Sequence, residues 1–208
     1  MRSCLLFVLI IGLIQCTPQK SDDSTTSNRW PGVEADSVRP TPRQITYHRK
    51  ERVAFIHFGI NTFTNREWGD GTEKASMFNP TNFDPEQWAK VLNETGFETL
   101  ILTAKHHDGF CLWPSKYTEF DVASSPWKNG NGDVVKAVAE ACQKYGIDFG
   151  IYLSPWDMHE PTYGTPEYNT FYMNQLRELL TNYGPIAEIC LPDTAENLYR
   201  YPGRLYGE

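Results

Sequence analysis

Four short apolar segments recur along the chain, and they predict four parallel β-strands. They span residues 53–58, 99–104, 149–153 and 186–191, and polar, glycine-containing loops bound them. Apolar runs of this length are typical of strands that are buried on both faces of a parallel sheet. The intervals between the strands are long enough for helices. The pattern therefore predicts a parallel α/β fold.

Each interval contains an amphipathic helix with start and stop signals. An Asp or Thr side chain at the start can accept hydrogen bonds from the free N–H groups of the first turn. A Gly at the end can adopt the left-handed conformation that stops a helix. The predicted starts are Asp84, Asp133 and Thr165, the predicted ends are Gly96, Gly146 and Gly184, and the predicted apolar faces include Trp88, Val91, Val134, Val138, Leu179 and Leu180.

The number of units indicates the architecture. Eight strand–helix units close a (β/α)8 barrel of the TIM type, which typically takes about 250 residues. This chain has 208 residues. We therefore predict that residues 41–189 hold about the first four units of such a barrel. A complete flavodoxin-like sheet would also fit the length, but the usual Gly-rich phosphate turn does not follow the first strand.

The first 40 residues have a different composition. Arg2 precedes an apolar run over residues 5–14, which suits an export signal and is too short to span a bilayer. We expect a signal peptide over 1–15 and a flexible, Ser/Thr/Asp/Pro-rich tether over 16–40. The segment ending at Cys16 resembles the lipid-attachment box of bacterial lipoproteins. We therefore expect a lipid on Cys16 and a location in the bacterial periplasm or at the cell surface; ordinary secretion is the alternative.

Charge and cysteine content narrow the range of ligands. The formal net charge is -7, and both signs are mixed along the sequence, which argues against a nucleic-acid partner. The five Cys residues form no Cys-x-x-Cys pair, which argues against a zinc ribbon. A neutral or weakly polar ligand fits better.

Histidines and aromatic residues follow the first three predicted strands. Ligands of parallel α/β folds bind at the carboxyl ends of the strands. A pyranose stacks on an indole, and a neutral imidazole offers its hydroxyls one donor and one acceptor. This favours a sugar site, although any single aromatic could simply belong to the core. The candidates are His57, Glu67, Trp68, His106, His107 and Tyr152, with Trp113, Trp127 and Trp156 in nearby loops.

A metal centre is the alternative interpretation of these histidines. His57, His106, His107 and Asp108 are residue types that bind zinc. A barrel metallohydrolase would be expected to carry two alternating histidines in its first strand, where this chain has His-Phe-Gly. We therefore expect no metal ion and no cofactor.

Six ordered motifs together resemble glycoside hydrolase family 29, the retaining α-L-fucosidases. The resemblance implies a (β/α)8 barrel that hydrolyses α-L-fucosyl residues of glycans. It implies that His57, Trp68, His106 and His107 hold the fucose hydroxyls, with Glu67 and Tyr152 nearby. Residues 61–64 and 67–69 resemble the branch that acts on α-1,3 and α-1,4 linkages. The motifs span residues 40–44, 57–64, 67–71, 104–110, 112–115 and 150–154.

The sequence departs from this family after the fourth strand. Family members use an Asp there as nucleophile and a second carboxylate as acid/base, about 5 Å apart. In this chain the position of that nucleophile falls on Pro192, which has no carboxylate. The remaining candidate is Asp193, one residue later. One step along a strand end turns a side chain to the other face of the sheet, which counts against Asp193. The acid/base is unknown. We hypothesise that 190–208 is an anomalous tail produced by a frameshift or truncation, and an inactive fucose-binding lipoprotein is the alternative function.

Overall fold

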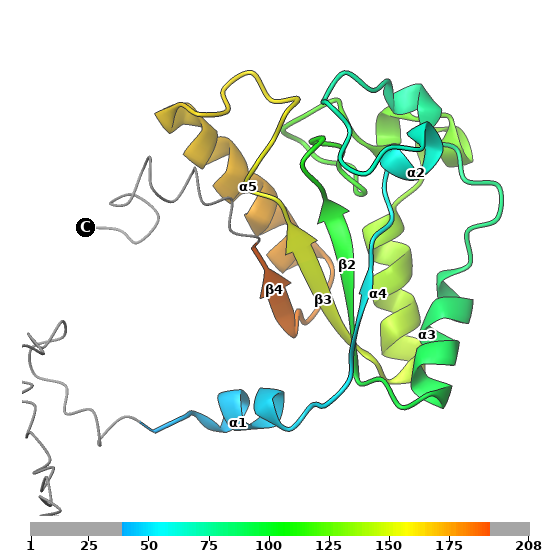
Figure 1. The fold of residues 1–208 in the computed structure, drawn as a ribbon, viewed down its shortest axis with the longest axis vertical. Helices are drawn as coiled ribbons and strands as arrows, with labels where there is room; N and C mark the ends of the chain where they lie inside the picture. The colour runs from blue at the N-terminus through cyan, green and yellow to red at the C-terminus, as the bar shows by residue number, and fades with distance from the viewer. Residues whose placement is uncertain (1–38, 192–208) are drawn as a thin grey trace, which may run out of the picture. The chain divides into compact units, whose positions relative to one another are not determined.

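The computed structural model describes residues 39–191, and from Pro42 onward they belong to one compact unit. Four parallel strands form one sheet in the order β1-β2-β3-β4 (Figure 1). This order and the intervening helices confirm the predicted parallel α/β fold. The elements are α1 (Pro42–His48), β1 (Val53–Ile56), α2 (Asn61–Thr64), α3 (Pro85–Glu94), β2 (Thr99–Lys105), α4 (Val134–Tyr145), β3 (Asp148–Leu153), α5 (Pro166–Asn182) and β4 (Glu188–Cys190), with 3₁₀ turns at Ala75–Met77, Val122–Ser124 and Trp127–Gly130.

The helix starts follow the predicted local chemistry in two of three cases. Asp84 accepts a hydrogen bond from the Gln87 N–H at 3.0 Å, and Asp133 accepts one from the Lys136 N–H at 2.8 Å. Thr165 is the N-cap residue of α5, but its side chain does not cap the helix; its hydroxyl donates to the Thr162 carbonyl instead. Glycines with positive φ follow all three helices, as predicted: Gly96, Gly146 and Gly184.

One face of the sheet packs against the helices. Leu102 of β2 and Ile151 of β3 are fully buried and join one apolar cluster with Val138 of α4 and Leu179 of α5. The opposite face carries the alternate residues of the strands. Phe55 of β1 lies there, in edge-to-face contact with Tyr152 of β3 at 5.5 Å. In a (β/α) barrel this second face is the inner one, and it leads to the carboxyl ends of the strands.

Two predicted apolar positions on the helices were wrong. Val91 and Leu180 are exposed. In α3 the fully buried residue is Ala89, and Trp88 and Leu92, four residues apart, pack on the core. Leu180 is adjacent to the buried Leu179, and one residue turns a helical side chain by about 100°.

Trp113 and Trp127, which lie in loops, are core residues. Trp113 is fully buried, and its indole N–H donates to the Glu178 carboxylate of α5 at 2.9 Å. Trp127 is buried against Phe78 and Phe83. A loop position in the sequence therefore did not mean exposure, because each of these rings packs against residues that lie far from it along the chain.

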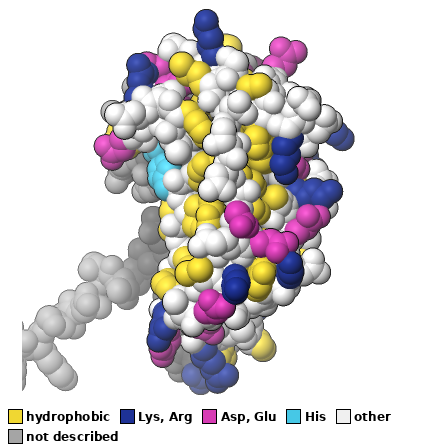
Figure 2. Space-filling model, turned by 90° about the vertical axis from the view of Figure 1, so that its right-hand side faces the viewer, with side chains coloured by type: hydrophobic (Ala, Val, Ile, Leu, Met, Phe, Trp, Pro, Cys, Tyr) yellow, Lys and Arg dark blue, Asp and Glu magenta, His cyan; other side chains and the backbone are white. Residues whose placement is uncertain are grey.

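The surface carries charges of both signs. Lys and Arg side chains alternate with Asp and Glu around apolar patches on the face in Figure 2, with no block of positive charge on that face. No helix within residues 39–191 has the length and apolar character needed to cross a bilayer.

Candidate functional site

Three imidazoles meet at the carboxyl ends of β1 and β2. His57 follows β1, and His106 and His107 follow β2. The ring centroids of His57 and His106 are 4.4 Å apart, and those of His106 and His107 are 4.1 Å apart. The sequence thus brings the three predicted histidines into one cluster at the edge where ligands of such folds bind.

A buried ion pair fixes the strand end below these rings. The register of β2 shifts between Thr103 and Lys105. The Lys105 ammonium, fully buried, donates to the Asp157 carboxylate at 2.8 Å and to the Gln175 side-chain oxygen at 2.9 Å. It also lies 5.3 Å from the centre of the Phe171 ring, a cation–π contact. Because Asp157 belongs to the loop after β3, this pair ties two site-bearing segments together.

Aromatic rings form a wall beside the imidazoles. The Trp156 ring lies 4.9 Å from His107, and Trp68 lies 5.8 Å from His107 and 6.0 Å from Trp156. Tyr152 stacks on His106 at 5.8 Å. Trp68 is 50% exposed, so its indole has free surface for a ligand. The wall offers apolar faces next to hydrogen-bonding nitrogens, which is what a pyranose requires.

The loop that presents Trp68 is held by a buried carboxylate. Glu73 accepts hydrogen bonds from the Asp70 N–H at 3.0 Å and from the Gly71 N–H at 2.9 Å. Gly71 has φ of 78°, and a Cβ there would lie 2.5 Å from the carbonyl carbon of Met158. Only glycine fits this close approach between the loops after β1 and β3. Trp68 is therefore presented by a fixed loop.

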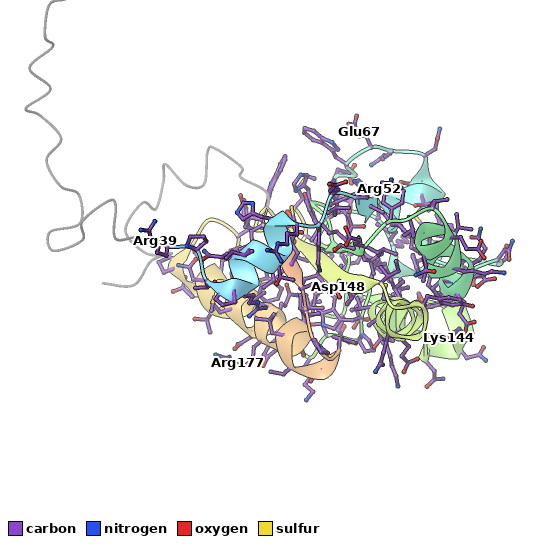
Figure 3. All side chains as sticks on the ribbon, turned by 90° about the horizontal axis from the view of Figure 1, so that it is seen from below. Arg39, Arg52, Glu67, Lys144, Asp148 and Arg177 are labelled. Carbon is purple, nitrogen blue, oxygen red and sulfur yellow. The ribbon has the colours of Figure 1, made fainter. Side chains whose placement is uncertain are left out.

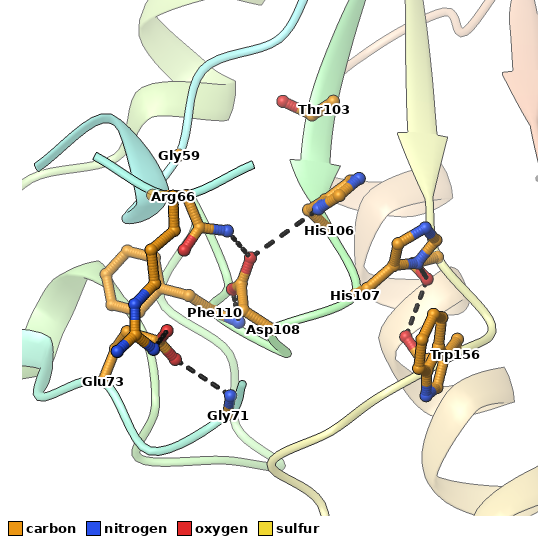
Figure 4. A network of polar contacts seen from close by, with 12 residues as sticks. Gly59, Arg66, Gly71, Glu73, Thr103, His106, His107, Asp108, Phe110 and Trp156 are labelled. Carbon is orange, nitrogen blue, oxygen red and sulfur yellow. Dashed lines mark hydrogen bonds and ion pairs between the residues drawn. The ribbon is translucent and has the colours of Figure 1, made fainter. Parts of the chain in front are cut away.

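Hydrogen bonding determines the tautomer of His107 (Figure 4). The Ser154 hydroxyl donates to the Trp156 carbonyl at 2.7 Å, so it can only accept from the His107 Nδ1 atom 2.7 Å away. The proton therefore lies on Nδ1. The Nε2 atom of His107 remains as a hydrogen-bond acceptor for a ligand hydroxyl.

The imidazoles are uncharged at neutral pH. Burial lowers the pKa of His106 to about 3, with the neighbouring imidazoles of His107 and His57 adding to the effect. Partial burial also lowers the pKa values of His57 and His107. A cluster of neutral imidazoles suits the hydroxyls of an uncharged sugar better than an anion.

Comparison with known proteins identifies the family. The model of the family described as alpha-L-fucosidase matches residues 41–200. The chain belongs to this family, glycoside hydrolase family 29. It is 53% identical over 153 residues to Alpha-L-fucosidase 1 of Arabidopsis thaliana, covering 73% of this chain and 30% of that protein. Against tissue alpha-L-fucosidase of Rattus norvegicus the identity is 30% over 223 residues, covering 86% of this chain and 46% of that protein.

Solved structures of family 29 share the fold. A family 29 member from an unknown rumen bacterium superposes with a TM-score of 0.73 at 52% identity, covering 74% of this chain and 28% of that chain. A Ruminococcus gnavus family 29 fucosidase in complex with fucose gives 0.65 at 45% identity, covering 70% and 33%. The strands described are thus the first four of a (β/α)8 barrel, and the chain spans about a third of several of these relatives.

The structure brings most of the predicted residues together at one place, with one more aromatic residue beside them. A connected series of ring contacts links His57, Trp68, His106, His107 and Tyr152. Glu67 is exposed. Burial lowers the pKa of His57, and the negative charge of Glu67 offsets part of that effect. The additional residue is Trp156. Its position three residues after the end of β3 was the available signal, but the sequence could not distinguish it from Trp113.

Two predicted residues lie outside the described range, namely Asp193, the candidate nucleophile, and Cys16, the candidate lipidation site. Within residues 39–191 no group of three or more His, Cys, Asp or Glu side chains is arranged to hold a metal ion.

A second hollow lies at the opposite end of the strands and carries none of this chemistry. It is a groove of about 760 Å³ between α1, the start of β3 and the turn after α5, and its lining includes Tyr47, Lys50, Asp148 and Tyr183. Figure 3 views the molecule from this end. Lys50 and Asp148 neutralise each other there. The candidate site is therefore the imidazole cluster at the carboxyl ends of the strands.

Proposed function

We propose that this chain provides the fucose-recognition half of the catalytic barrel of a retaining α-L-fucosidase. The observation that carries the proposal is the cluster of three neutral imidazoles beside Trp68 and Trp156 at the carboxyl ends of β1–β3. Membership of family 29 supports the reaction class. The substrate class is a fucosylated glycan or oligosaccharide, and no cofactor is needed for this chemistry.

The proposed roles follow from the donors and acceptors available. His107 accepts from a sugar hydroxyl through Nε2, because Nδ1 is bound to Ser154. His57 and His106 each offer one further donor or acceptor. The apolar edge of the sugar packs on the Trp68 indole. These contacts orient the anomeric carbon toward the end of β4; Asp193, the candidate nucleophile, follows that strand in the sequence.

A matched pair of exposed residues tests the recognition step. Trp68 and Met77 are equally exposed and lie in the same segment between β1 and α3. Trp68→Ala should lower the affinity for L-fucose about tenfold, and Met77→Ala should leave it unchanged. Saturation-transfer NMR on the full chain measures this affinity. Equal affinities of both variants and the parent chain would exclude the proposed site.

Hydrolysis of 4-nitrophenyl α-L-fucoside tests the reaction itself. Release of nitrophenol that Asp193→Asn abolishes would support both the enzyme and its nucleophile. Fucose binding without any hydrolysis would instead favour the alternative function, an inactive fucose-binding lipoprotein. One observation favours this alternative. The carboxyl groups that the described residues bring near the imidazoles are Glu67, which is exposed, and Asp108, which is buried and engaged by Asn61.

For the linkage we propose α-1,3 and α-1,4 fucose in branched glycans, on the resemblance of residues 61–64 and 67–69 to that branch of the family. Asn61 and Gly69, from these two segments, lie close together, since a Cβ at Gly69 would be 2.7 Å from the Asn61 side-chain oxygen. Binding of α-1,3-, α-1,4- and α-1,2-fucosylated oligosaccharides can be compared directly. A preference for the α-1,2 linkage would exclude this assignment.

For the location we propose export and lipid attachment at Cys16, which would place the protein in the bacterial periplasm or at the cell surface. The support is the sequence of residues 1–16 alone. Labelling with a fatty-acid analogue should mark the parent chain and fail to mark Cys16→Ser. Equal labelling of both chains would contradict the anchor.

A further inference from the structure

One buried nitrogen of the site has no hydrogen-bond partner. His106 is 91% buried and lies at the centre of the imidazole cluster. Its Nδ1 atom is fully buried and makes no hydrogen bond. A buried polar atom without a partner is costly and calls for an explanation. The Oδ2 atom of Asp108 lies 3.9 Å from it, which is too long for a hydrogen bond (Figure 4).

Asp108 is firmly held beside that nitrogen. Its Oδ1 accepts from the Phe110 N–H at 2.7 Å, and its Oδ2 accepts from the Asn61 side-chain amide at 2.8 Å. The residue is 2% exposed. Oδ2 has a second lone pair, so it can engage the His106 ring while it keeps Asn61. A closure of about 1 Å is enough to make that hydrogen bond.

The charges around Asp108 are mainly negative. Glu73, from the loop that presents Trp68, and Asp157, from the loop after β3, both act on it and raise its pKa. Arg66 is bound to Glu73, and Lys105 is bound to Asp157, so each of these neighbours is partly compensated. Burial is the largest influence and, with these charges, raises the pKa of Asp108 to about 7. The carboxyl group therefore changes its protonation state near neutral pH.

We propose that Asp108 is a positioning residue that determines which nitrogen of His106 carries the proton, and so whether His106 donates to or accepts from the sugar. The ionised carboxylate accepts from Nδ1–H and leaves the Nε2 lone pair for the ligand. The protonated carboxyl donates its O–H to Nδ1, and the ring proton then lies on Nε2. One proton is taken up in this change. His106 itself stays neutral in both states.

The consequence concerns the sugar. Below the transition, His106 presents an N–H donor through Nε2, and above it the same atom presents an acceptor. His107 is not subject to this change, because Ser154 holds its proton on Nδ1. Asp108 would thus give one of two adjacent imidazoles a hydrogen-bonding polarity that depends on pH.

The test is an NMR titration of the full chain labelled with ¹⁵N-histidine. The chain has five His residues, and His106→Gln assigns the relevant signal. Between about pH 5.5 and pH 8.5 the His106 signals should change from the Nε2–H to the Nδ1–H pattern as the pH rises. A His106 ring that keeps one tautomer throughout, or becomes a cation at the acidic end, would overturn the proposal.

Three variants separate positioning from general damage. Asp108→Asn should fix His106 in one tautomer across the range. Glu73→Gln keeps Asp108 and removes a neighbouring negative charge, so the transition should move to lower pH. Asp121→Asn is the matched control, because Asp121 is equally buried, also accepts from backbone N–H groups and lies away from the imidazoles; it should change nothing. A transition that persists in Asp108→Asn, or is unmoved in Glu73→Gln, would overturn the proposal. The titration needs no ligand, so its result is independent of whether the chain binds fucose.

Discussion

The two central strands and the two outer strands of the sheet differ in how much of them is buried. Every residue of β2 is buried, and so is β3 after its first residue, whereas β1 alternates between exposed and half-buried residues and β4 has none that is buried. Within residues 39–191, β1 pairs only with β2, and β4 only with β3. The two central strands are therefore covered by the rest of the described chain, whereas the two outer strands are covered only in part. In a closed eight-stranded barrel the outer strands would each have a second partner.

The site spans both kinds of strand. His106 and His107 follow the buried strand β2, and Tyr152 belongs to β3, so their positions are fixed by the core. His57 follows β1 and is exposed. The side chains that the central strands position should therefore tolerate substitutions elsewhere with little change in their positions. The position of His57, after β1, should be more sensitive to such changes. The predictions below test this contrast.

The largest effect is expected at the ion pair behind β2. Lys105→Met leaves Asp157 buried without its cation and should lower the free energy of unfolding by about 3–5 kcal/mol. Urea denaturation measures this change. Lys144→Met is the matched control, because Lys144 pairs with Glu86 on the surface, and its loss should be barely measurable. A small effect at Lys105 would mean that the strand end is not held by this pair.

A pair of phenylalanines compares a central and an outer strand directly. Phe149 of β3 is 5% exposed, and Phe149→Ala should cost about 3–5 kcal/mol. Phe55 of β1 is 48% exposed, and Phe55→Ala should cost about 1 kcal/mol, because half of its surface is already in water. Urea denaturation of both variants measures the two losses in the free energy of unfolding. Equal losses would show that β1 is covered in solution.

The smallest effect concerns stability at acidic pH. Because the folded-state pKa of His106 is about 3 and its ordinary value is 6.5, the unfolded chain binds more protons between these values. The free energy of unfolding should therefore fall as the pH drops through this window, and His106→Gln should make the fall shallower. His57→Gln should have less effect, because His57, which follows β1, is more exposed than His106.

The pKa of Asp108 is shifted in the opposite direction to that of His106, so Asp108 should have the opposite effect on stability as the pH falls. Its folded-state pKa of about 7 lies above the ordinary value of 3.8, so the folded chain binds the extra proton between these values and gains stability as the pH falls. Asp108→Asn removes that gain and should make the fall on acidification steeper. Thermal denaturation at a series of pH values measures all three slopes. Relative to the parent chain, the slope should become shallower in His106→Gln and steeper in Asp108→Asn; changes of the same sign in both variants would contradict the assignment of their pKa shifts.

Features determined by a few neighbouring residues could be predicted from the sequence. The caps at Asp84 and Asp133 and the strands β2 and β3 were predicted because hydrogen bonding and apolar runs are local. The outer strands were predicted too long. β1 ends at Ile56 and not at Phe58, and β4 is confined to Glu188–Cys190, because strand length depends on pairing with neighbours.

Features that depend on distant contacts could not be predicted. Trp113 and Trp156 both follow strands in the sequence. Trp113 is buried and donates a hydrogen bond to Glu178, 65 residues away in the sequence, whereas Trp156 packs on His107. The helix α2 and the 3₁₀ turns carry no clear pattern. The role of Asp108 required the position of Asn61, 47 residues earlier.

The central claim is that L-fucose binds at the imidazole cluster at the carboxyl ends of β1–β3. The most direct measurement is to add L-fucose to the isotopically labelled full chain and to map the NMR shift changes, with D-fucose as the control. The account predicts changes at the Trp68 indole and at the rings of His106 and His107 with L-fucose alone. Changes confined to the groove around Tyr47 and Tyr183, or equal changes with both enantiomers, would contradict it.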